Sequence, residues 1–379
     1  MTHRSSAQRV QAVYALAVLA LLIGTCVVTD LLAQNRSLER WLTATASALV
    51  EGNGKVFSYD GNFIDFEDRL MLDEVPRTDY SKGGIYFFGT SNMKLAFQTW
   101  DLPTNERRLV HNYGIGAADH SIQLRFINYL TTYHRFLTAG DRDLVVFGAA
   151  FQNAVGDAYL HGYFLSELRR WGLFTITRDG VIAPASVSPI ARWLQIEKAR
   201  STGFIWNLGR LAHYWALTKF GRGQSPPRDP HSYQRHWWEV AGPQWWPNID
   251  SQLDSLKEAI ELARSRHADV MVMLLPQASW MDGLLFRSLY DEEVRALCQR
   301  TSTPLTDFSQ AIPDEEFVDS SHWGAEGQRQ FRDLIMPEIL AHLRRMETQE
   351  KGSNPPPRAA VTRRRAKAGR ASSSKVGVR

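Results

Sequence analysis

The 379-residue sequence predicts an α/β protein, a three-layer α/β/α sandwich built on a five-stranded parallel sheet. The main observation is a rhythm that begins at residue 84, in which short apolar runs alternate with amphipathic stretches. Two further features frame that rhythm. An apolar run, residues 10–33, precedes it, and a tryptophan-rich stretch, residues 154–250, interrupts it. We therefore expect one transmembrane helix, then a sheet domain that carries a helical insertion.

Five short apolar runs are the expected strands. The first, GIYFFG, is apolar throughout and ends in glycine, and the fourth, DVMVMLLP, ends in proline. Continuous apolar runs of this length are typical of strands that are buried on both faces of a parallel sheet. The five runs are residues 84–89, 107–114, 143–151, 269–276 and 304–308.

Amphipathic stretches between these runs are the expected helices. In residues 119–137, for example, Ile122, Phe126 and Leu130 share one helical face. The other expected helices are residues 36–52, 251–267, 291–299 and 325–343. Alternating strands and helices predict helices on both faces of the sheet, with functional side chains at the carboxyl ends of the strands.

Residues 10–33 are nearly all apolar and reach the length of about 20 residues that a membrane-spanning helix needs. Arg4 and Arg9 precede them, which favours a cytoplasmic N-terminus (residues 1–9) and an exported body. We expect an uncleaved single-pass anchor in the cell membrane. Cleavage as a signal peptide, or lipidation at Cys26, is the alternative.

The positive charge of the chain is concentrated at its C-terminus. Residues 351–379 hold nine lysines and arginines and no acidic residue, so the formal net charge of +4 leaves the rest of the chain at −5. We therefore expect no nucleic-acid partner. The tail, residues 349–379, is rich in Pro, Ser and Arg and is predicted to be disordered.

The insertion is unusual in its aromatic content, because eight of the twelve tryptophans lie between Trp171 and Trp246. Two interpretations stay open: the indoles form the core of the insertion, or they form a stacking surface for sugar rings. The expected divisions of the chain are residues 1–9, 10–33, 34–83 (membrane-proximal), 84–153 (first part of the sheet domain), 154–250, 251–348 (its second part) and 349–379.

The sequence holds the three residue types of a catalytic triad, a serine, a histidine and an aspartate, near the expected ends of strands and the start of a helix. Ser91 directly follows the first strand, where its hydroxyl would be exposed at the carboxyl edge of the sheet. A serine needs a base within hydrogen-bond reach to act as a nucleophile. His322, at the start of the last helix, can be that base, and Asp319 can orient its imidazole.

The order of these residues resembles that of the SGNH, or GDSL-like, hydrolases. In that family the serine follows the first strand and a D-x-x-H near the C-terminus completes the triad. DSSHWGAEG (319–327) is the strongest match, GTSN (89–92) matches the nucleophile block with Thr90 where many members have aspartate, and NYGIGA (112–117) is similar to the next block. The resemblance implies a flavodoxin-like strand arrangement and an ester hydrolase that needs no cofactor.

The same resemblance implies an oxyanion hole made by the backbone N–H groups of Ser91 and Gly116 and by the side chain of Asn153. The usual glycine spacing and the following aspartate are absent around Asn153, so Gln152 is a rival donor. Candidate substrate contacts are Asn92, Gln152 and Trp323.

Histidines also invite a metal interpretation, but no tight ligand spacing is present, and no metal site is predicted. The histidines concerned are His111, His120 and His134, with Asp119 beside them.

With its single expected span, the chain also resembles membrane-anchored members of the family such as the alginate O-acetylation proteins. That resemblance implies a serine esterase or O-acyltransferase outside the cytoplasm, acting on acetyl esters of a cell-envelope polysaccharide, with a membrane acyl-exporting partner for a transferase. The alternatives are a non-catalytic polysaccharide-binding or assembly factor and a lipid esterase.

Overall fold

A computed structural model describes residues 3–33, 70–96, 109–155, 158–198, 229–317 and 321–353, together with single residues between these ranges, among them Asp319. Most of the expected membrane-proximal helix (36–52) and of the basic tail (349–379) lies outside the described residues.

A five-stranded parallel sheet forms the centre of the molecule, as the sequence predicted. Its strand order is β2-β1-β3-β6-β7, so the chain steps first to one side of β1 and then to the other. This is the order of doubly wound sheets, in which ligands bind at the carboxyl edge where the order reverses. The strands are β1 (Gly84–Gly89), β2 (Val110–Gly114), β3 (Asp143–Ala149), β6 (Asp269–Leu274) and β7 (Leu305–Asp307).

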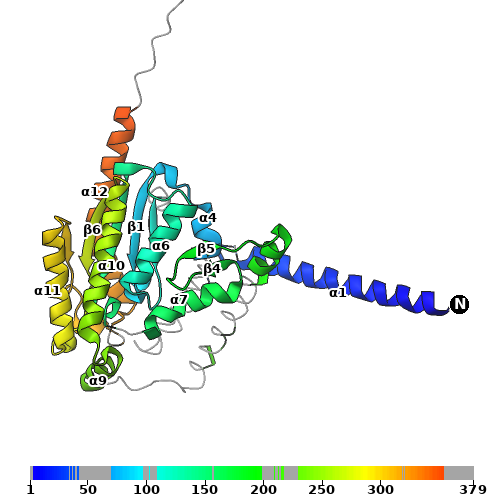
Figure 1. Cartoon of the computed structure of the whole chain (residues 1–379), viewed down its shortest axis with the longest axis horizontal. Coiled ribbons are helices and arrows are strands. Elements are labelled where there is room, and N and C mark those ends of the chain that lie inside the picture. The colour runs from blue at the N-terminus through cyan, green and yellow to red at the C-terminus, as the bar shows by residue number, and fades with distance from the viewer. Residues whose placement is uncertain are drawn as a thin grey trace, which may run out of the picture.

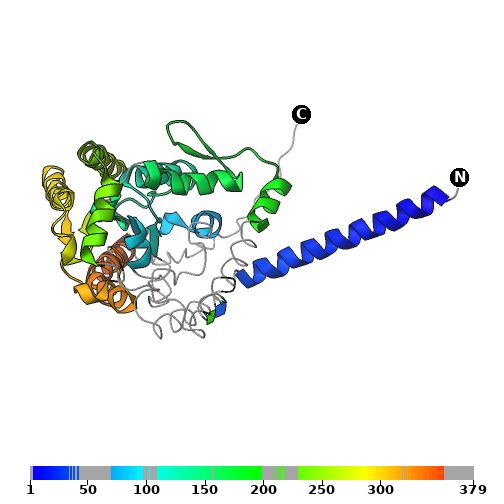
Figure 2. The same ribbon diagram turned by 90° about the horizontal axis from the view of Figure 1, so that it is seen from below.

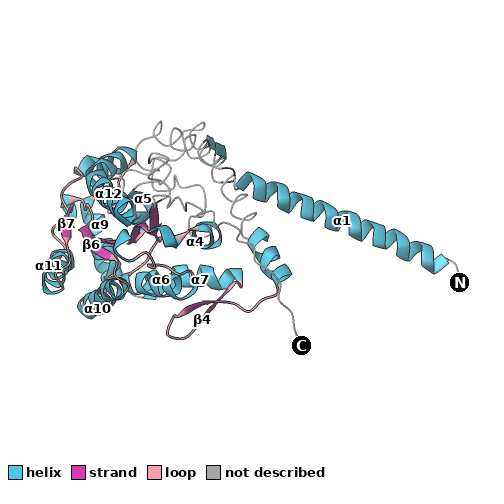
Figure 3. Ribbon diagram, turned by 90° about the horizontal axis from the view of Figure 1, so that it is seen from above, coloured by secondary structure: helices cyan, strands magenta, loops and turns pink. Residues whose placement is uncertain are grey.

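Helices cover both faces of the sheet (Figure 3). One face carries α6 (His120–Tyr133), α10 (Trp245–Ser265) and α11 (Leu285–Arg300), and the other carries α5 (Ser91–Ala96) and α12 (Ala325–Ser353). The short α4 (Val75–Arg77) precedes β1. All residues of β1 and β3 are buried between these layers, which is why their sequences are apolar without alternation.

Local hydrogen bonds and backbone angles explain where helix α6 begins and ends. The carboxylate of Asp119 accepts the N–H of Ile122 at 2.8 Å and so caps α6. This helix ends at Tyr133 rather than at 137, because Arg135 and Leu137 adopt left-handed backbone angles (φ 56° and 57°). In contrast, α10 begins at Trp245, six residues before the expected helix start at 251.

The insertion combines helices with a small hairpin that the sequence did not predict. It holds α7 (Ala158–Trp171), the antiparallel pair β4 (Phe174–Ile176) and β5 (Ile182–Pro184), and α9 (Pro230–Ala241). Some of its indoles are buried and contribute to a core, whereas others are exposed; a stacking surface for sugar rings stays a prediction. Trp171 and Trp237 are buried, whereas Trp193, Trp215, Trp238 and Trp246 are 41–51% exposed.

The N-terminal helix α1 (His3–Ala33) extends away from the sheet domain (Figure 1), and the view from below shows the same separation (Figure 2). Many of its apolar side chains are exposed, for example Tyr14, Leu21 and Leu31. Within the described residues, no helix has both the length and the apolar character required for crossing a membrane.

Candidate active site

The site begins where β1 turns into α5. Ser91 is the first residue of α5, and the carbonyl oxygen of Thr90 accepts the helix hydrogen bond from the N–H of Lys94 at 3.0 Å. Glycines let this helix approach the strand ends closely. A Cβ atom added to Gly89 would lie 2.5 Å from Cβ of Met93, and one added to Gly114 would lie 2.3 Å from the backbone nitrogen of Lys94. These two glycines thus allow α5 to hold Ser91 at the carboxyl edge of the sheet.

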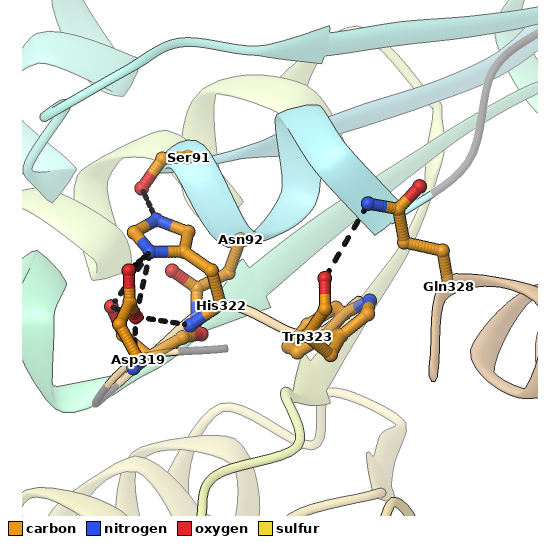
Figure 4. A network of polar contacts seen from close by, with 7 residues as sticks. Ser91, Asn92, Asp319, His322, Trp323 and Gln328 are labelled. Carbon is orange, nitrogen blue, oxygen red and sulfur yellow. Dashed lines mark hydrogen bonds and ion pairs between the residues drawn. The ribbon is translucent and has the colours of Figure 1, made fainter. Parts of the chain in front are cut away.

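Three predicted side chains meet at this edge, although Ser91 and His322 are 231 residues apart in the chain (Figure 4). Oγ of Ser91 lies 2.7 Å from Nε2 of His322. Nδ1 of His322 lies 2.9 Å from Oδ2 and 3.0 Å from Oδ1 of Asp319. A neutral imidazole with its proton on Nδ1 fits this arrangement, because Nδ1 then donates to the carboxylate and Nε2 accepts from the serine hydroxyl.

The carboxylate of Asp319 is held by the backbone as well as by the ring. Its Oδ1 accepts the N–H groups of Ser321 and His322, each at 2.8 Å. Burial alone would raise the pKa of Asp319, but the charge interaction with His322 and these hydrogen bonds outweigh it and leave the pKa below its usual value. Asp319 therefore stays ionised at neutral pH and can stabilise a positive charge on the imidazole.

Asn92 has a different place from the one expected. It is 1% exposed, and its Nδ2 donates to the carbonyl oxygen of Ser321 at 2.7 Å (Figure 4). This amide therefore lies inside the protein and holds the loop of His322, so we no longer assign it to substrate. Ser321 itself was not singled out from the sequence, yet its hydroxyl lies 3.2 Å from Nδ1 of His322. Its place inside the D-x-x-H stretch was the available signal.

The two candidate side-chain amides after β3 differ in their hydrogen bonding. The side chain of Asn153 is fully buried and engaged at both ends, since Oδ1 accepts the N–H of Ala150 at 2.8 Å and Nδ2 donates to the carbonyl of Ala118 at 3.1 Å. Asn153 therefore holds its own turn, and we withdraw it as the oxyanion donor. Gln152 is also buried, but neither polar atom of its amide has a hydrogen-bond partner among the described residues.

Gly116 follows the end of β2 and is partly exposed. The next residue, Ala117, adopts a left-handed conformation with φ of 55°. Such a backbone is uncommon for alanine and marks a tightly specified turn. The turn lies at the same sheet edge as Ser91, because β2 and β1 are parallel neighbours that pair Gly114 with Gly89.

Trp323 was expected to contact substrate, and the structure corrects this. Its side chain is 1% exposed and packs against Phe317 and Phe331. Residues 317 and 323 also pair as an isolated bridge. Trp323 thus closes the base of the loop that carries Asp319 and His322, and it cannot reach a ligand from that position.

The remaining histidines lie apart from one another. His111 stacks on Tyr86 within the sheet, and Nε2 of His120 lies 2.7 Å from the hydroxyl of Tyr290. The ring of His134 pairs with the hydroxyl of Tyr129 at 2.8 Å. Over the described part of the chain, no group of three His, Cys, Asp or Glu side chains is arranged to hold a metal ion.

Comparisons with known proteins give weak likenesses. No family model matches the chain, and no curated protein matches its sequence. Among solved structures, a provisionally assigned acylhydrolase from Bacteroides fragilis is 14% identical with a TM-score of 0.39, covering 72% of this chain and 94% of its own. A GDSL-like lipase from Bacteroides thetaiotaomicron is 11% identical with a TM-score of 0.38, covering 74% and 98%.

A third structure, a provisionally assigned platelet activating factor from Streptococcus pneumonia, is 10% identical with a TM-score of 0.37, covering 72% of this chain and 92% of its own. At these similarities the fold rests on the strand order of the chain itself and any activity rests on its own site. The finer resemblance to alginate O-acetylation proteins stays a prediction.

Proposed function

We propose that this protein is a serine esterase or O-acyltransferase of the SGNH type that works through an acyl-enzyme. The observation that carries the proposal is the 2.7 Å contact between Oγ of Ser91 and Nε2 of His322, with Asp319 on the far side of the ring. A nucleophile, a base and an orienting carboxylate in hydrogen-bond contact are the set that acyl transfer requires.

In the first half of the reaction, Oγ of Ser91 attacks the carbonyl carbon of the ester while Nε2 of His322 takes the hydroxyl proton. The imidazolium is stabilised by Asp319, whose Oδ2 lies 2.9 Å from Nδ1. When the tetrahedral intermediate collapses, the bond to the leaving alcohol breaks and His322 returns the proton to that alcohol. An ester between the acyl group and Ser91 remains.

In the second half, His322 removes a proton from water or from a sugar hydroxyl as that oxygen attacks the acyl-enzyme. The bond between the acyl carbon and Oγ of Ser91 then breaks, and His322 returns the proton to Oγ. Water gives hydrolysis, and a sugar hydroxyl gives transfer, so the acceptor alone distinguishes the two activities. The backbone N–H groups of Ser91 and Gly116 are the proposed donors to the oxyanion. Gln152 is the proposed side-chain donor, which its unpartnered amide supports.

We further propose that the substrate is an acetylated cell-envelope polysaccharide and that residues 10–33 anchor the catalytic domain outside the cytoplasm. The half-exposed indoles of Trp238 and Trp246 support the first point, because flat apolar faces suit sugar rings. The apolar sequence of residues 10–33 supports the second. A transferase would also need a membrane partner that exports the acyl group.

The test is turnover of a chromogenic acetyl ester by the purified full-length chain, beside Ser91→Ala. We expect the wild-type chain to release acetate and Ser91→Ala to lose this activity while keeping its thermal transition. Labelling of the wild-type serine by a fluorophosphonate should follow the same pattern. A folded wild-type chain that is inert to both reagents would refute the esterase and favour a non-catalytic polysaccharide-binding role.

A further inference from the structure

We propose that Asn92 is a positioning residue that sets the distance between the nucleophile and the base. This inference rests on the proposed function, because it assigns a task within the Ser91–His322 pair. Its basis is the hydrogen bond from Nδ2 of Asn92 to the carbonyl oxygen of Ser321, 2.7 Å long and spanning 229 residues of sequence.

The two ends of this bond are each one residue from a reacting group. Asn92 directly follows Ser91 on α5, and Ser321 directly precedes His322 in its loop. The bond therefore fixes the peptide that carries the imidazole against the turn of helix that carries the hydroxyl (Figure 4). Both Asn92 and Ser321 are buried, at 1% and 5% exposure, so water does not compete for the bond.

The hydrogen bonds within the loop fix its internal shape rather than its distance from α5. Asp319 accepts hydrogen bonds from Ser321 and His322 within the loop, and residues 317 and 323 pair at its base. These contacts would travel with the loop if it moved as a unit. The Asn92 bond joins the loop to the nucleophile helix, so it can hold His322 within reach of Ser91 before substrate arrives.

The unused end of the amide also points to this task. Oδ1 of Asn92 is buried and has no hydrogen-bond partner among the described residues. The other buried asparagines near this edge use both ends: Asn112 accepts from Gly114 and donates to Met93, and Asn153 does the same with Ala150 and Ala118. A buried acceptor without a partner lowers the stability of the fold. Asn92 therefore lowers stability through its unpaired oxygen, which indicates that the hydrogen bond donated by its Nδ2 serves the site.

A nearby amide offers a matched control. Nε2 of Gln328, on α12, donates to the carbonyl oxygen of Trp323 at 3.4 Å, so it also bonds to a carbonyl beside His322 (Figure 4). This bond reaches the loop from α12 and does not involve the nucleophile helix. If the loss of any hydrogen bond to this loop slowed the reaction equally, Gln328→Ala and an Asn92 variant would show the same loss of rate.

The experiment compares wild type, Asn92→Asp, Asn92→Ala and Gln328→Ala as full-length chains. Asn92→Asp keeps the shape of the side chain but replaces the donor with an oxygen that faces the Ser321 carbonyl. The first readout is the rate constant for phosphonylation by a fluorophosphonate, in which the Ser91 oxygen bonds to phosphorus, fluoride leaves and His322 takes the serine proton. This rate constant reports on folded sites, because unfolded molecules lower the labelled fraction rather than the rate.

We expect Asn92→Asp and Asn92→Ala to lower the phosphonylation rate constant and kcat for the acetyl ester by about 10–100-fold, since misplacing a reacting group by about 1 Å has this effect. KM should stay near the wild-type value, and Gln328→Ala should stay within about threefold of wild type in both rates. The Asn92→Ala variant keeps the test possible if the buried aspartate of Asn92→Asp prevents folding.

Wild-type rates in folded Asn92 variants would overturn the inference while leaving the proposed function intact. The same loss in Gln328→Ala as in Asn92→Ala would also overturn it, because the loop would then be sensitive to any lost bond. A wild-type chain that is itself inert, or a Ser91→Ala chain that stays active, would overturn the proposed function and this inference together.

Discussion

Replacing Asp319 with asparagine should remove most of the activity by changing which nitrogen of His322 carries the proton. Oδ1 of Asp319 accepts two backbone N–H groups, from Ser321 and His322, so the asparagine oxygen should keep that place. The new NH₂ group then faces Nδ1 of His322, where Oδ2 now lies at 2.9 Å. Nδ1 must become the acceptor, and the proton moves to Nε2. In that tautomer, Nε2 cannot take the proton of Ser91.

The loss of charge adds to the tautomer effect. A carboxylate and an imidazolium about 4 Å apart attract each other by about 4 kcal/mol at an effective dielectric constant of about 20. The side chain of Asp319 is 32% exposed, so solvent screening reduces this value to about 3 kcal/mol. That energy corresponds to about a 100-fold loss of rate, and the wrong tautomer raises the expected loss to about 10³–10⁴-fold.

The assay is kcat/KM for a chromogenic acetyl ester, measured beside Ser91→Ala and Asp314→Asn. Asp314 is a suitable control because its carboxylate accepts the N–H of Ser279 at 2.7 Å and makes a structural link just upstream. It should keep kcat/KM within about threefold. If Asp319→Asn retains more than a tenth of wild-type activity while Ser91→Ala is inactive, the assigned role of the carboxylate is wrong.

Three further substitutions test the packing around the site. Gly114→Ala places a Cβ 2.3 Å from the backbone nitrogen of Lys94, so it should displace α5 and cost about 1–3 kcal/mol of stability together with activity. The control is Gly209→Ala, because no atom of the described residues lies within 4 Å of the added Cβ. Trp323→Ala should cost about 3–5 kcal/mol in urea unfolding, and a raised KM at unchanged stability would restore it as a substrate contact. Burial raises the pKa of Asp143 to about 6, so Asp143→Asn should stabilise the protein above pH 6 relative to wild type, and an equal difference at pH 4 would contradict this cause.

The sheet could be predicted because its strands are buried on both faces. Apolar runs such as 84–89 and 143–149 have few competing interpretations, and their order along the chain dictates a parallel sheet. The hairpin of β4 and β5 could not be predicted in this way, since each strand has three residues, too few to show a period of two. The early start of α10 was also hidden, because its Trp-rich first turn looks like part of the insertion.

Within the site, the sequence could indicate which residues lie at strand ends but not how each amide is used. The proximity of Ser91 and His322 follows from placing both at the carboxyl edge. Whether Asn153, Asn92 or Gln152 is free depends on hydrogen bonds to backbone groups far away in sequence, such as the carbonyls of Ala118 and Ser321. A buried tryptophan and an exposed one also look alike in a sequence, so Trp323 was misassigned.

The buried titratable groups of the sheet domain act in opposite directions on stability. Burial raises the pKa of Asp143 and Asp291 to about 6, so the folded state holds protons there that the unfolded chain releases above pH 4. Burial also lowers the pKa of four histidines, which the unfolded chain protonates below about pH 6.5. These are His111, His120, His134 and His342.

Between pH 4 and 6, each such histidine makes stability rise with pH, and each carboxyl makes it fall, by up to about 1.4 kcal/mol per pH unit. The pKa values of His111 and His120 fall to about 4, so these two histidines oppose the two carboxyls across this range. The lowered pKa values of His134 and His342 add to the rise, so the net stability should increase with pH. Removing one carboxyl, as in Asp143→Asn, should steepen the rise, and removing one buried histidine, as in His120→Gln, should flatten it. The measurement is the slope of the urea-unfolding free energy against pH. Opposite changes of this slope in the two variants are expected if burial perturbs both pKa values, because an ion pair between such groups would shift each pKa in the other direction.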